Sequence, residues 1–243
     1  MSRFFVPAEA VKGNIITISG NEAHHIIDVM RLRLSDKVVT FDGTGKEYAG
    51  IIKEVSRNSL MVEITETRAA QKKETSRITL LQALPKKEKM DYIVEKATEL
   101  GVHSIDPILT ERTIPDWSEA KKESQARRWR KIVLEAAKQC GRLDIPEVAN
   151  ISRFDDAVKR FELFDLKLIA ILSEEAVPIK EAIKDFKSGS VVIAIGPEGD
   201  FSLDEAESAK KHGFKPVNLG PRVLKSDTAG LALLSILNYE FTS

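Results

Sequence analysis

The fold is decided near the end of the chain, by residues 191–202, which read VVIAIGPEGDFS. Five apolar residues, mostly β-branched, predict a buried strand over 191–195, and Gly196-Pro197 ends it. Ser202 and Glu205 have the spacing of a capping box, which predicts the start of a helix. A Gly-Pro loop therefore lies between the carboxyl end of a strand and a helix, which is where open α/β sheets bind ligands.

A second Gly-Pro loop occupies residues 219–230, LGPRVLKSDTAG. It joins a predicted strand over 216–219 to an apolar helix over 228–239, with Ser226 or Asp227 as the expected N-cap. If the two strands are neighbours in a parallel sheet, both loops meet at one edge and form a ligand site. Neither loop matches a phosphate-binding motif, so we expect a ligand held by backbone groups and apolar walls. The helix is apolar on nearly every side, and it packs either on its own sheet or in a subunit interface.

The pattern of predicted secondary structure changes once along the chain, which predicts two domains. Residues 1–70 contain short β-rich runs separated by turn residues, with one short helix over 22–32, and predict a compact β-barrel. The polar stretch 68–76 is the linker candidate. Over 74–243, strands alternate with helices, which predicts an α/β domain with a mostly parallel sheet covered on both faces. Its predicted strands are 78–84, 105–109, 166–172, 191–195 and 216–219.

Composition excludes several classes of protein. The chain is 42% hydrophobic and 30% charged, with a formal net charge of zero, and it has no apolar run near the roughly 20 residues of a membrane span. The N-terminus does not have the pattern of a signal peptide, and a single cysteine, Cys140, excludes an intrachain disulfide, so we expect a cytoplasmic protein. The histidines show no zinc-ligand spacing, and no metal is expected.

Basic residues concentrate on a predicted helix around Trp129. On a helical projection, one apolar face carries Trp129, Ile132, Val133, Ala136, Ala137 and Cys140. The opposite arc carries a basic stripe, which we define as Arg127, Lys131, Lys138 and Arg142. Such a stripe suits the phosphate backbone of a nucleic acid, and it equally suits plain solvation.

The two Gly-Pro loops resemble the cofactor loops of the SPOUT class of RNA methyltransferases. More narrowly, the chain resembles the bacterial 16S ribosomal RNA uracil-N3 methyltransferases. Other matching segments are SRFF (2–5), HHIIDVMRLR (24–33), EKATELG (95–101) and EAAKQCGR (135–142). The resemblance implies an N-terminal PUA-like β-barrel, a C-terminal α/β domain with a deep trefoil knot, and a homodimer formed through that domain. It also implies S-adenosylmethionine as the methyl donor, and 16S rRNA of the small ribosomal subunit as the partner.

The resemblance also implies roles for individual residues. The residues expected to bind the cofactor are Leu172, Ile195, Gly196, Pro197, Gly199, Leu219, Gly220, Val223, Leu224, Thr228 and Ala229. The residues expected to bind RNA are the basic stripe, Lys86 and Lys87 after the first strand of the α/β domain, and Arg3, Arg31 and Arg33 in the barrel. The chain departs from the family pattern at three positions: Asp200 replaces a usual Gly, Lys225 a usual Arg, and Asp227 a usual Glu.

Methylation of uracil N3 requires that N3 loses its proton and attacks the methyl group in line. A nearby cation stabilises the developing negative charge on the base, and Arg222 and Lys225 are the candidates. Glu198 is the candidate proton acceptor, or else it holds its loop by accepting backbone hydrogen bonds. Two other functions stay open at this point: methylation of a ribose or another base on the same fold, and RNA binding by a non-catalytic dimer.

Overall fold

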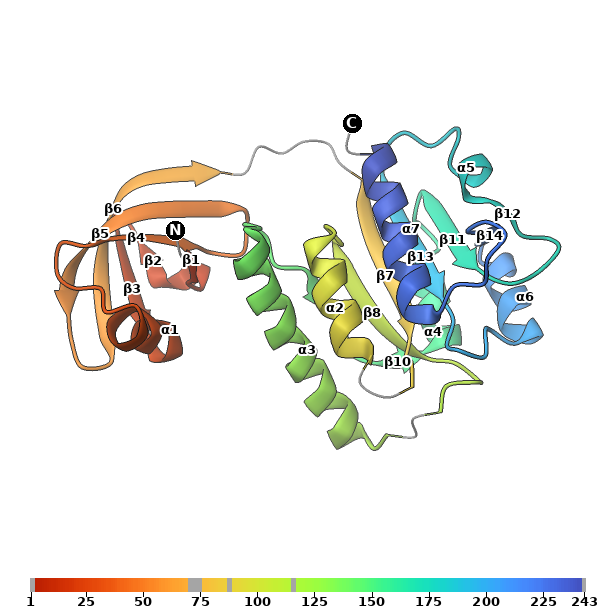
Figure 1. Cartoon of the computed structure of the whole chain (residues 1–243), viewed down its shortest axis with the longest axis horizontal. Coiled ribbons are helices and arrows are strands. Elements are labelled where there is room, and N and C mark those ends of the chain that lie inside the picture. The colour runs from red at the N-terminus through yellow and green to blue at the C-terminus, as the bar shows by residue number, and fades with distance from the viewer. Residues whose placement is uncertain (1–2, 70–75, 87–88, 115–116, 242–243) are drawn as a thin grey trace. The chain divides into compact units, whose positions relative to one another are not determined.

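The computed structural model describes residues 3–69, 76–86, 89–114 and 117–241 (Figure 1). It divides the chain into two compact units, one formed by 1–72 with 137–145 and the other by 73–136 with 146–243. Ser2, Lys87 and most of the predicted linker lie outside the described residues.

The first unit is built on a six-stranded sheet, ordered β1-β4-β5-β6-β3-β2, in which only β1 and β4 run parallel. Its strands are β1 (Arg3–Phe5), β2 (Val11–Lys12), β3 (Ile15–Ser19), β4 (Lys37–Phe41), β5 (Lys46–Val55) and β6 (Ser59–Ala69). The helical pieces are η1 (Ala8–Ala10), α1 (Gly20–His24) and η2 (His25–Val29). Alternate residues of the strands point inward and enclose one core, which includes Phe4, Ile16, Ile52 and Val62.

Residues 137–145 belong to this first unit although they lie far along the chain. The Gly45 amide donates to the Leu143 carbonyl (3.0 Å), and the Arg3 guanidinium donates to the Gly141 carbonyl (2.7 Å). Lys138 forms an ion pair with Glu22 (2.7 Å). The sequence pattern of this stretch is that of a helix and predicts that it belongs to the C-terminal domain, because contacts between segments so far apart leave no local signal.

The second unit contains an eight-stranded parallel sheet, ordered β10-β8-β7-β13-β11-β14-β12, with β9 also paired to β8. The strands are β7 (Arg77–Ala83), β8 (Ser104–Leu109), β9 (Glu147–Val148), β10 (Ser152–Arg153), β11 (Leu166–Ala170), β12 (Val177–Pro178), β13 (Ser190–Ile195) and β14 (Lys215–Asn218). The helices are α2 (Lys89–Glu99), α3 (Glu119–Cys140), α4 (Phe154–Arg160), α5 (Ile179–Ala182), α6 (Leu203–Lys211) and α7 (Ser226–Phe241). Helix α3 begins in this unit and ends in the first.

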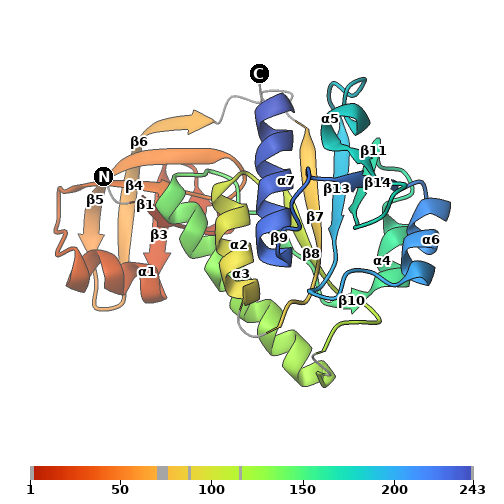
Figure 2. The ribbon, with the colours of Figure 1, turned by 45° about the vertical axis from the view of Figure 1, so that its right-hand side comes forward.

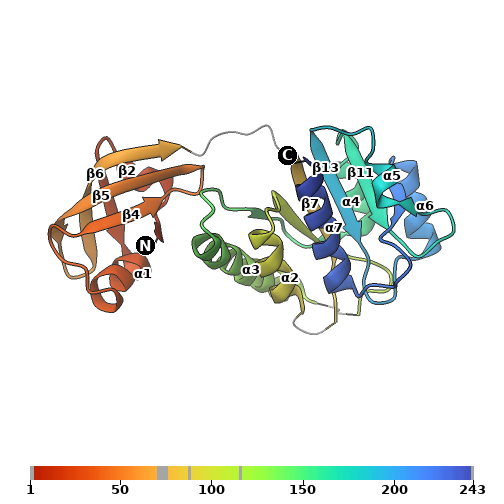
Figure 3. The ribbon, with the colours of Figure 1, turned by 45° about the horizontal axis from the view of Figure 1, so that its top comes forward.

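Helices cover both faces of this sheet (Figures 2 and 3). In β13, Val192 and Ala194 join the core formed with α4 and α6, while Ile195 points to the opposite face, where α7 lies. Helix α7 comes close to the sheet at Gly230, where a Cβ atom would meet side chains of β7 and β13 at 3.1–3.5 Å. The central strands are therefore apolar on both sides, as the sequence predicts. Within the described chain, α7 packs on its own sheet and on α2, while Tyr239 near its end is 78% exposed.

The strand order differs from the expectation in one respect that shapes the site. The Gly-Pro loops follow β13 and β14, and the condition that these strands are neighbours is not met, because β11 lies between them. Because all three strands are parallel, the segment after β11 ends at the same edge as both loops. The segment after β11 therefore lies beside the two predicted Gly-Pro loops as a third part of the site.

Candidate functional site

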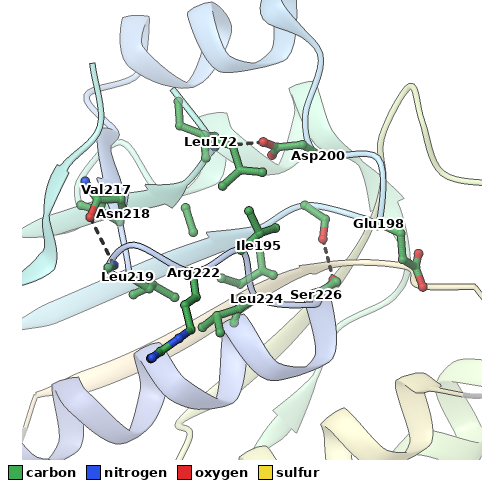
Figure 4. Close-up of a pocket in the computed structure, with 16 residues that line it drawn as sticks. Leu172, Ile195, Glu198, Asp200, Val217, Asn218, Leu219, Arg222, Leu224 and Ser226 are labelled. Carbon is green, nitrogen blue, oxygen red and sulfur yellow. Dashed lines mark hydrogen bonds between the residues drawn. The ribbon is translucent and has the colours of Figure 1, made fainter. Parts of the chain in front are cut away.

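A cavity lies at the carboxyl ends of β11, β13 and β14 (Figure 4). It measures about 650 Å³ with the open space at its mouth included, and its lining residues lie within the segments 170–172, 195–200 and 217–229 without filling them. Most of the lining side chains are apolar, and the polar ones belong to Glu198, Asp200, Asn218, Arg222 and Ser226.

Most residues predicted to bind a cofactor meet here. Those that line the cavity are Leu172, Ile195, Gly196, Leu219, Gly220, Val223, Leu224 and Ala229. Glu198 and Arg222, predicted to be catalytic, also line it. The lining does not include Pro197, Gly199, Thr228 or Lys225. The sequence analysis did not assign Ala170, Ile171, Asp200, Val217, Asn218 or Ser226 to the site, although they line it.

Ser226 connects the two Gly-Pro loops. Its hydroxyl donates to the Gly196 carbonyl (2.6 Å) and accepts from the Gln82 side-chain amide of β7 (3.0 Å). The predicted N-cap role at Ser226 or Asp227 is wrong, because α7 begins at Ser226 and both residues lie in its first turn. The hydroxyl is buried, and it satisfies a carbonyl of the first loop rather than an amide of its own helix.

Glu198 is held by groups from two other segments. Its carboxylate accepts hydrogen bonds from the Lys86 amide (3.2 and 3.1 Å) and from Lys89 Nζ (3.0 Å), and Lys89 also reaches Asp227 (3.5 Å). Partial burial raises the pKa of Glu198, but the bonds from Lys89 and the Lys86 amide outweigh burial and leave it below its ordinary value. In Figure 4 this side chain points away from Leu172 and Leu219. The arrangement favours the loop-holding role over the proton-acceptor role.

Arg112 holds the first loop from outside the cavity. It donates to the carbonyls of Gly199 (2.7 Å) and Phe201 (3.2 Å). The predicted capping box is present, since the Ser202 and Glu205 side chains bond to each other's amides, and Glu205 also accepts from the Glu111 amide (2.8 Å). Nothing in the motif pointed to Arg112 or Lys89. The only available signal was that both follow predicted strands that end at this edge.

The second loop is more open. Gly220 has a φ of +104°, which glycine adopts without strain, and a Cβ there would meet nothing within 4 Å. Val223 is 73% exposed at the cavity wall, and Arg222 is exposed beside it. Lys225 is also exposed but stands outside the lining.

Comparisons with known proteins match both units of the chain. The family model for an RNA methyltransferase domain matches residues 72–238, and the one for an RNA methyltransferase PUA domain matches 18–65. Ribosomal RNA small subunit methyltransferase E of Bacillus subtilis is 29% identical over 250 residues, covering 99% of this chain and 97% of that protein. The chain belongs to the ribosomal RNA small subunit methyltransferase E family.

Solved structures of the family share the fold over the whole chain. A methyltransferase from Legionella pneumophila with bound S-adenosylmethionine has a TM-score of 0.86 and 32% identity, covering 98% of this chain and 96% of that one. The methyltransferase E of Neisseria gonorrhoeae, also bound to S-adenosylmethionine, has a TM-score of 0.85 and 29% identity, with coverage of 99% and 98%. The predicted fold class, a SPOUT methyltransferase domain with an N-terminal PUA-like domain, is confirmed.

The cavity of this family member fits a nucleoside with a flat base. Leu172, Ile195 and Leu224 supply apolar surface for a ring system, and the open space at Gly220 lets a ligand lie against bare backbone. Among the described residues, no group of three or more His, Cys, Asp and Glu side chains could hold a metal ion. In the same part of the chain, no helix is long and apolar enough to span a membrane.

The residues predicted to bind RNA do not gather at one place, in contrast to those predicted to bind the cofactor. Several have internal partners: Arg3 pairs with Glu47 (2.9 Å) and Lys138 with Glu22. Arg127 pairs with Glu123 (2.5 Å), Arg142 pairs with Asp144, and Arg33 donates to the Ile27 carbonyl (2.9 Å). The basic stripe divides between the two units, with Arg127 and Lys131 in one and Lys138 and Arg142 in the other. Arg31, Lys86 and Lys131 are exposed.

The apolar face of α3 also differs from the expectation at its end. Trp129 is buried, and its indole donates to Asp91 of α2 (3.1 Å), which fixes the helix in the second unit. Val133 and Ala137 are buried as well, whereas Cys140 is exposed. The helical face therefore ends one turn before the sequence pattern indicates.

Proposed function

We propose that this protein transfers a methyl group from S-adenosylmethionine to N3 of a specific uridine in 16S rRNA. The observation that carries the proposal is the cavity formed by three segments at one sheet edge, with apolar walls, an open glycine and an exposed arginine at its mouth. The names of the family relatives support rRNA as the substrate. The donor, bound in this cavity, would supply an electrophilic methyl group.

The chain's own residues would position the base and stabilise its charge. N3 of uracil carries a weakly acidic proton, and a guanidinium near O2 or O4 stabilises the anion that forms when this proton leaves. Arg222 is suited to this role because it lines the cavity and projects from the more open loop. Lys225, outside the lining, would reach the RNA rather than the reacting base. Glu198 stays anionic and keeps the first loop in place, so in this account the N3 proton passes to a solvent water rather than to Glu198.

Two measurements test the proposal. Calorimetry should show one S-adenosylmethionine bound per chain, and the absence of binding heat would favour a non-catalytic RNA-binding protein. Mass spectrometry of 16S rRNA incubated with the enzyme and donor should find 3-methyluridine at a single position. Methylation of a ribose oxygen or of another base would refute the N3 assignment. Running the reaction on free rRNA and on 30S particles identifies the substrate form.

We also propose that the enzyme works in the cytoplasm as a homodimer formed through the C-terminal domain. The exposed Tyr92 of α2 and Tyr239 of α7 support this, since the two helices pack together and present aromatic surface. Sedimentation equilibrium should give twice the chain mass, and a monomer at micromolar concentration would contradict it.

RNA binding is proposed to depend on the exposed cations rather than on the paired ones. Arg31→Ala and Lys131→Ala should weaken rRNA binding, and each should reduce the slope of log affinity against log salt by about 0.7–0.9. Lys210→Ala is the matched control, because Lys210 already pairs with Glu175 (2.7 Å). An unchanged salt slope in both test variants would remove these residues from the RNA surface.

A further inference from the structure

Asp200 has a backbone conformation that favours glycine. Its φ is +62°, in the left-handed region, where an L-residue other than glycine is uncommon. Non-glycine residues in such conformations concentrate at functional sites. The adjacent Gly199 does not have a positive φ, so the left-handed turn falls on the residue that carries a carboxylate.

The carboxylate of Asp200 accepts from two backbone amides, one in another segment of the cavity wall and one in its own loop. Oδ2 accepts from the Leu172 amide (3.0 Å), in the segment after β11, and Oδ1 accepts from the neighbouring Phe201 amide (2.8 Å). The dashed line at the top of Figure 4 marks the first of these bonds. Leu172 lies beyond the end of β11, so the sheet no longer holds its amide. The Asp200 side chain therefore connects the first Gly-Pro loop, which follows β13, to the segment that follows β11.

We propose that Asp200 is a positioning residue for the methyl donor: its carboxylate fixes Leu172 against the first loop and so shapes the cavity before the donor binds. The inference rests on the proposed function, because it takes S-adenosylmethionine as the ligand. A wall that is already ordered does not have to be ordered at binding, and preorganisation of this kind increases affinity. The left-handed φ is then the cost of placing a carboxylate where it reaches both amides.

Two substitutions separate the carboxylate from the backbone conformation. Asp200→Gly keeps the left-handed turn and removes the acceptor. Asp200→Asn also tolerates the turn and keeps one acceptor oxygen for the Leu172 amide. Asp165→Gly is the matched control, because the Asp165 carboxylate makes a similar bridge to the Ser190 amide (2.7 Å) at the opposite ends of β11 and β13.

The experiment measures S-adenosylmethionine affinity by calorimetry and, without donor, hydrogen exchange of the Leu172 amide. We expect Asp200→Gly to lose roughly tenfold in affinity with faster exchange at Leu172 and an unchanged melting temperature. Asp200→Asn should lose less than about threefold. Asp165→Gly should keep wild-type affinity.

Other results would overturn the inference. Wild-type affinity in Asp200→Gly would show that the bridge does not serve donor binding. Equal losses in Asp200→Asn and Asp200→Gly would assign the effect to charge rather than to positioning. If the wild type itself bound no donor, the proposed function would fail, whereas slow exchange at Leu172 in the wild type would still establish the bridge.

Discussion

The two Gly-Pro loops lie at the same sheet edge, yet they are built differently. In the first loop, Gly196 accepts a hydrogen bond from Ser226, Glu198 from Lys86 and Lys89, and Gly199 from Arg112. In the second loop, residues 219–224 make a single hydrogen bond within the described chain, from the Gly220 amide to Asn218 Oδ1 (3.3 Å). Pro197 is buried and Pro221 is exposed.

This difference indicates that the loops have separate tasks. The first loop is a fixed wall, because bonds from the segment after β7, from α2, from α7 and from the segment after β8 constrain it. The second loop presents exposed side chains, Arg222 and Val223, that are free to adapt to the donor and the RNA. Substitutions that distort the first loop should therefore change donor affinity, whereas replacing Arg222 of the second loop should change the step that involves the base.

The largest effect is expected at Arg222 of the second loop. Arg222→Ala should lower kcat by about 100-fold, the usual order for removing one group that stabilises developing charge. Donor affinity should stay at the wild-type value, and Arg222→Lys should recover part of kcat because it restores charge without the planar fork. Single-turnover methylation and calorimetry on the same samples check this. A parallel loss of donor affinity would contradict the separation of tasks.

A substitution at Gly196 of the first loop should instead lower donor affinity. A Cβ there would lie 3.2 Å from the Phe201 amide nitrogen and 3.3 Å from Asp200 Cα, so Gly196→Val forces the loop open. Overpacking costs about 1–3 kcal/mol, which corresponds to a roughly 10- to 100-fold loss of donor affinity.

Gly199, the other glycine of the first loop, supplies the control for the Gly196→Val experiment. At Gly199 a Cβ would meet only the Arg112 side chain, at 3.5 Å, and the residue does not line the cavity. Gly199→Ala should therefore bind donor like the wild type. If both variants lost the same donor affinity, the effect would not depend on where the side chain is added. That result would contradict the interpretation of the first loop as a fixed wall of the cavity.

Ser226 tests whether the start of α7 stabilises the first loop. Ser226→Ala leaves the Gly196 carbonyl and the Gln82 side-chain amide without this partner, and the free energy of unfolding should fall by about 1–3 kcal/mol. Ser235→Ala, on an exposed turn of the same helix, should change it by less than about 0.5 kcal/mol. Urea denaturation measures both. Similar values for the two variants would contradict the bridging role.

The smallest effect is expected for Glu198→Gln. Glutamine keeps an acceptor for the Lys86 amide but loses the charge that Lys89 contacts, so donor affinity should fall a few-fold and kcat should stay within about threefold. A general base would instead cost roughly 100-fold or more in kcat, and that result would restore Glu198 as the proton acceptor.

The Glu198 carboxylate should also make donor affinity depend on pH. Because the pKa of Glu198 is lowered from its ordinary value of 4.5, its bonds stabilise the loop fully above that value. The stabilisation is lost as the pH falls through the lowered pKa. Donor affinity followed from pH 7 downward should stay level to about pH 5 and then decline, and Glu198→Gln should remove the part of the decline that belongs to this residue.

The sequence was informative where backbone and local pattern determine structure. The apolar run of β13, the capping box at Ser202 and the glycines of both loops predicted the fold class and the sheet edge. Contacts between distant segments were out of reach. Nothing local shows that β11 separates β13 from β14, that residues 137–145 join the first unit, or that Arg112 and Lys89 hold a loop. Charged side chains were the least predictable, because a neighbouring acid in the fold decides whether a cation such as Lys138 is free.

Amide hydrogen exchange with and without S-adenosylmethionine tests the contrast between the loops most directly. Without donor, the amides of Asp200, Phe201 and Ser202, which donate hydrogen bonds, should already be protected, and those of 219–224 should exchange fast. Saturation with donor should slow exchange mainly in 219–224. If the gain in protection instead fell on 196–202, or if 219–224 did not respond, the account of one fixed wall and one adaptable wall would be wrong.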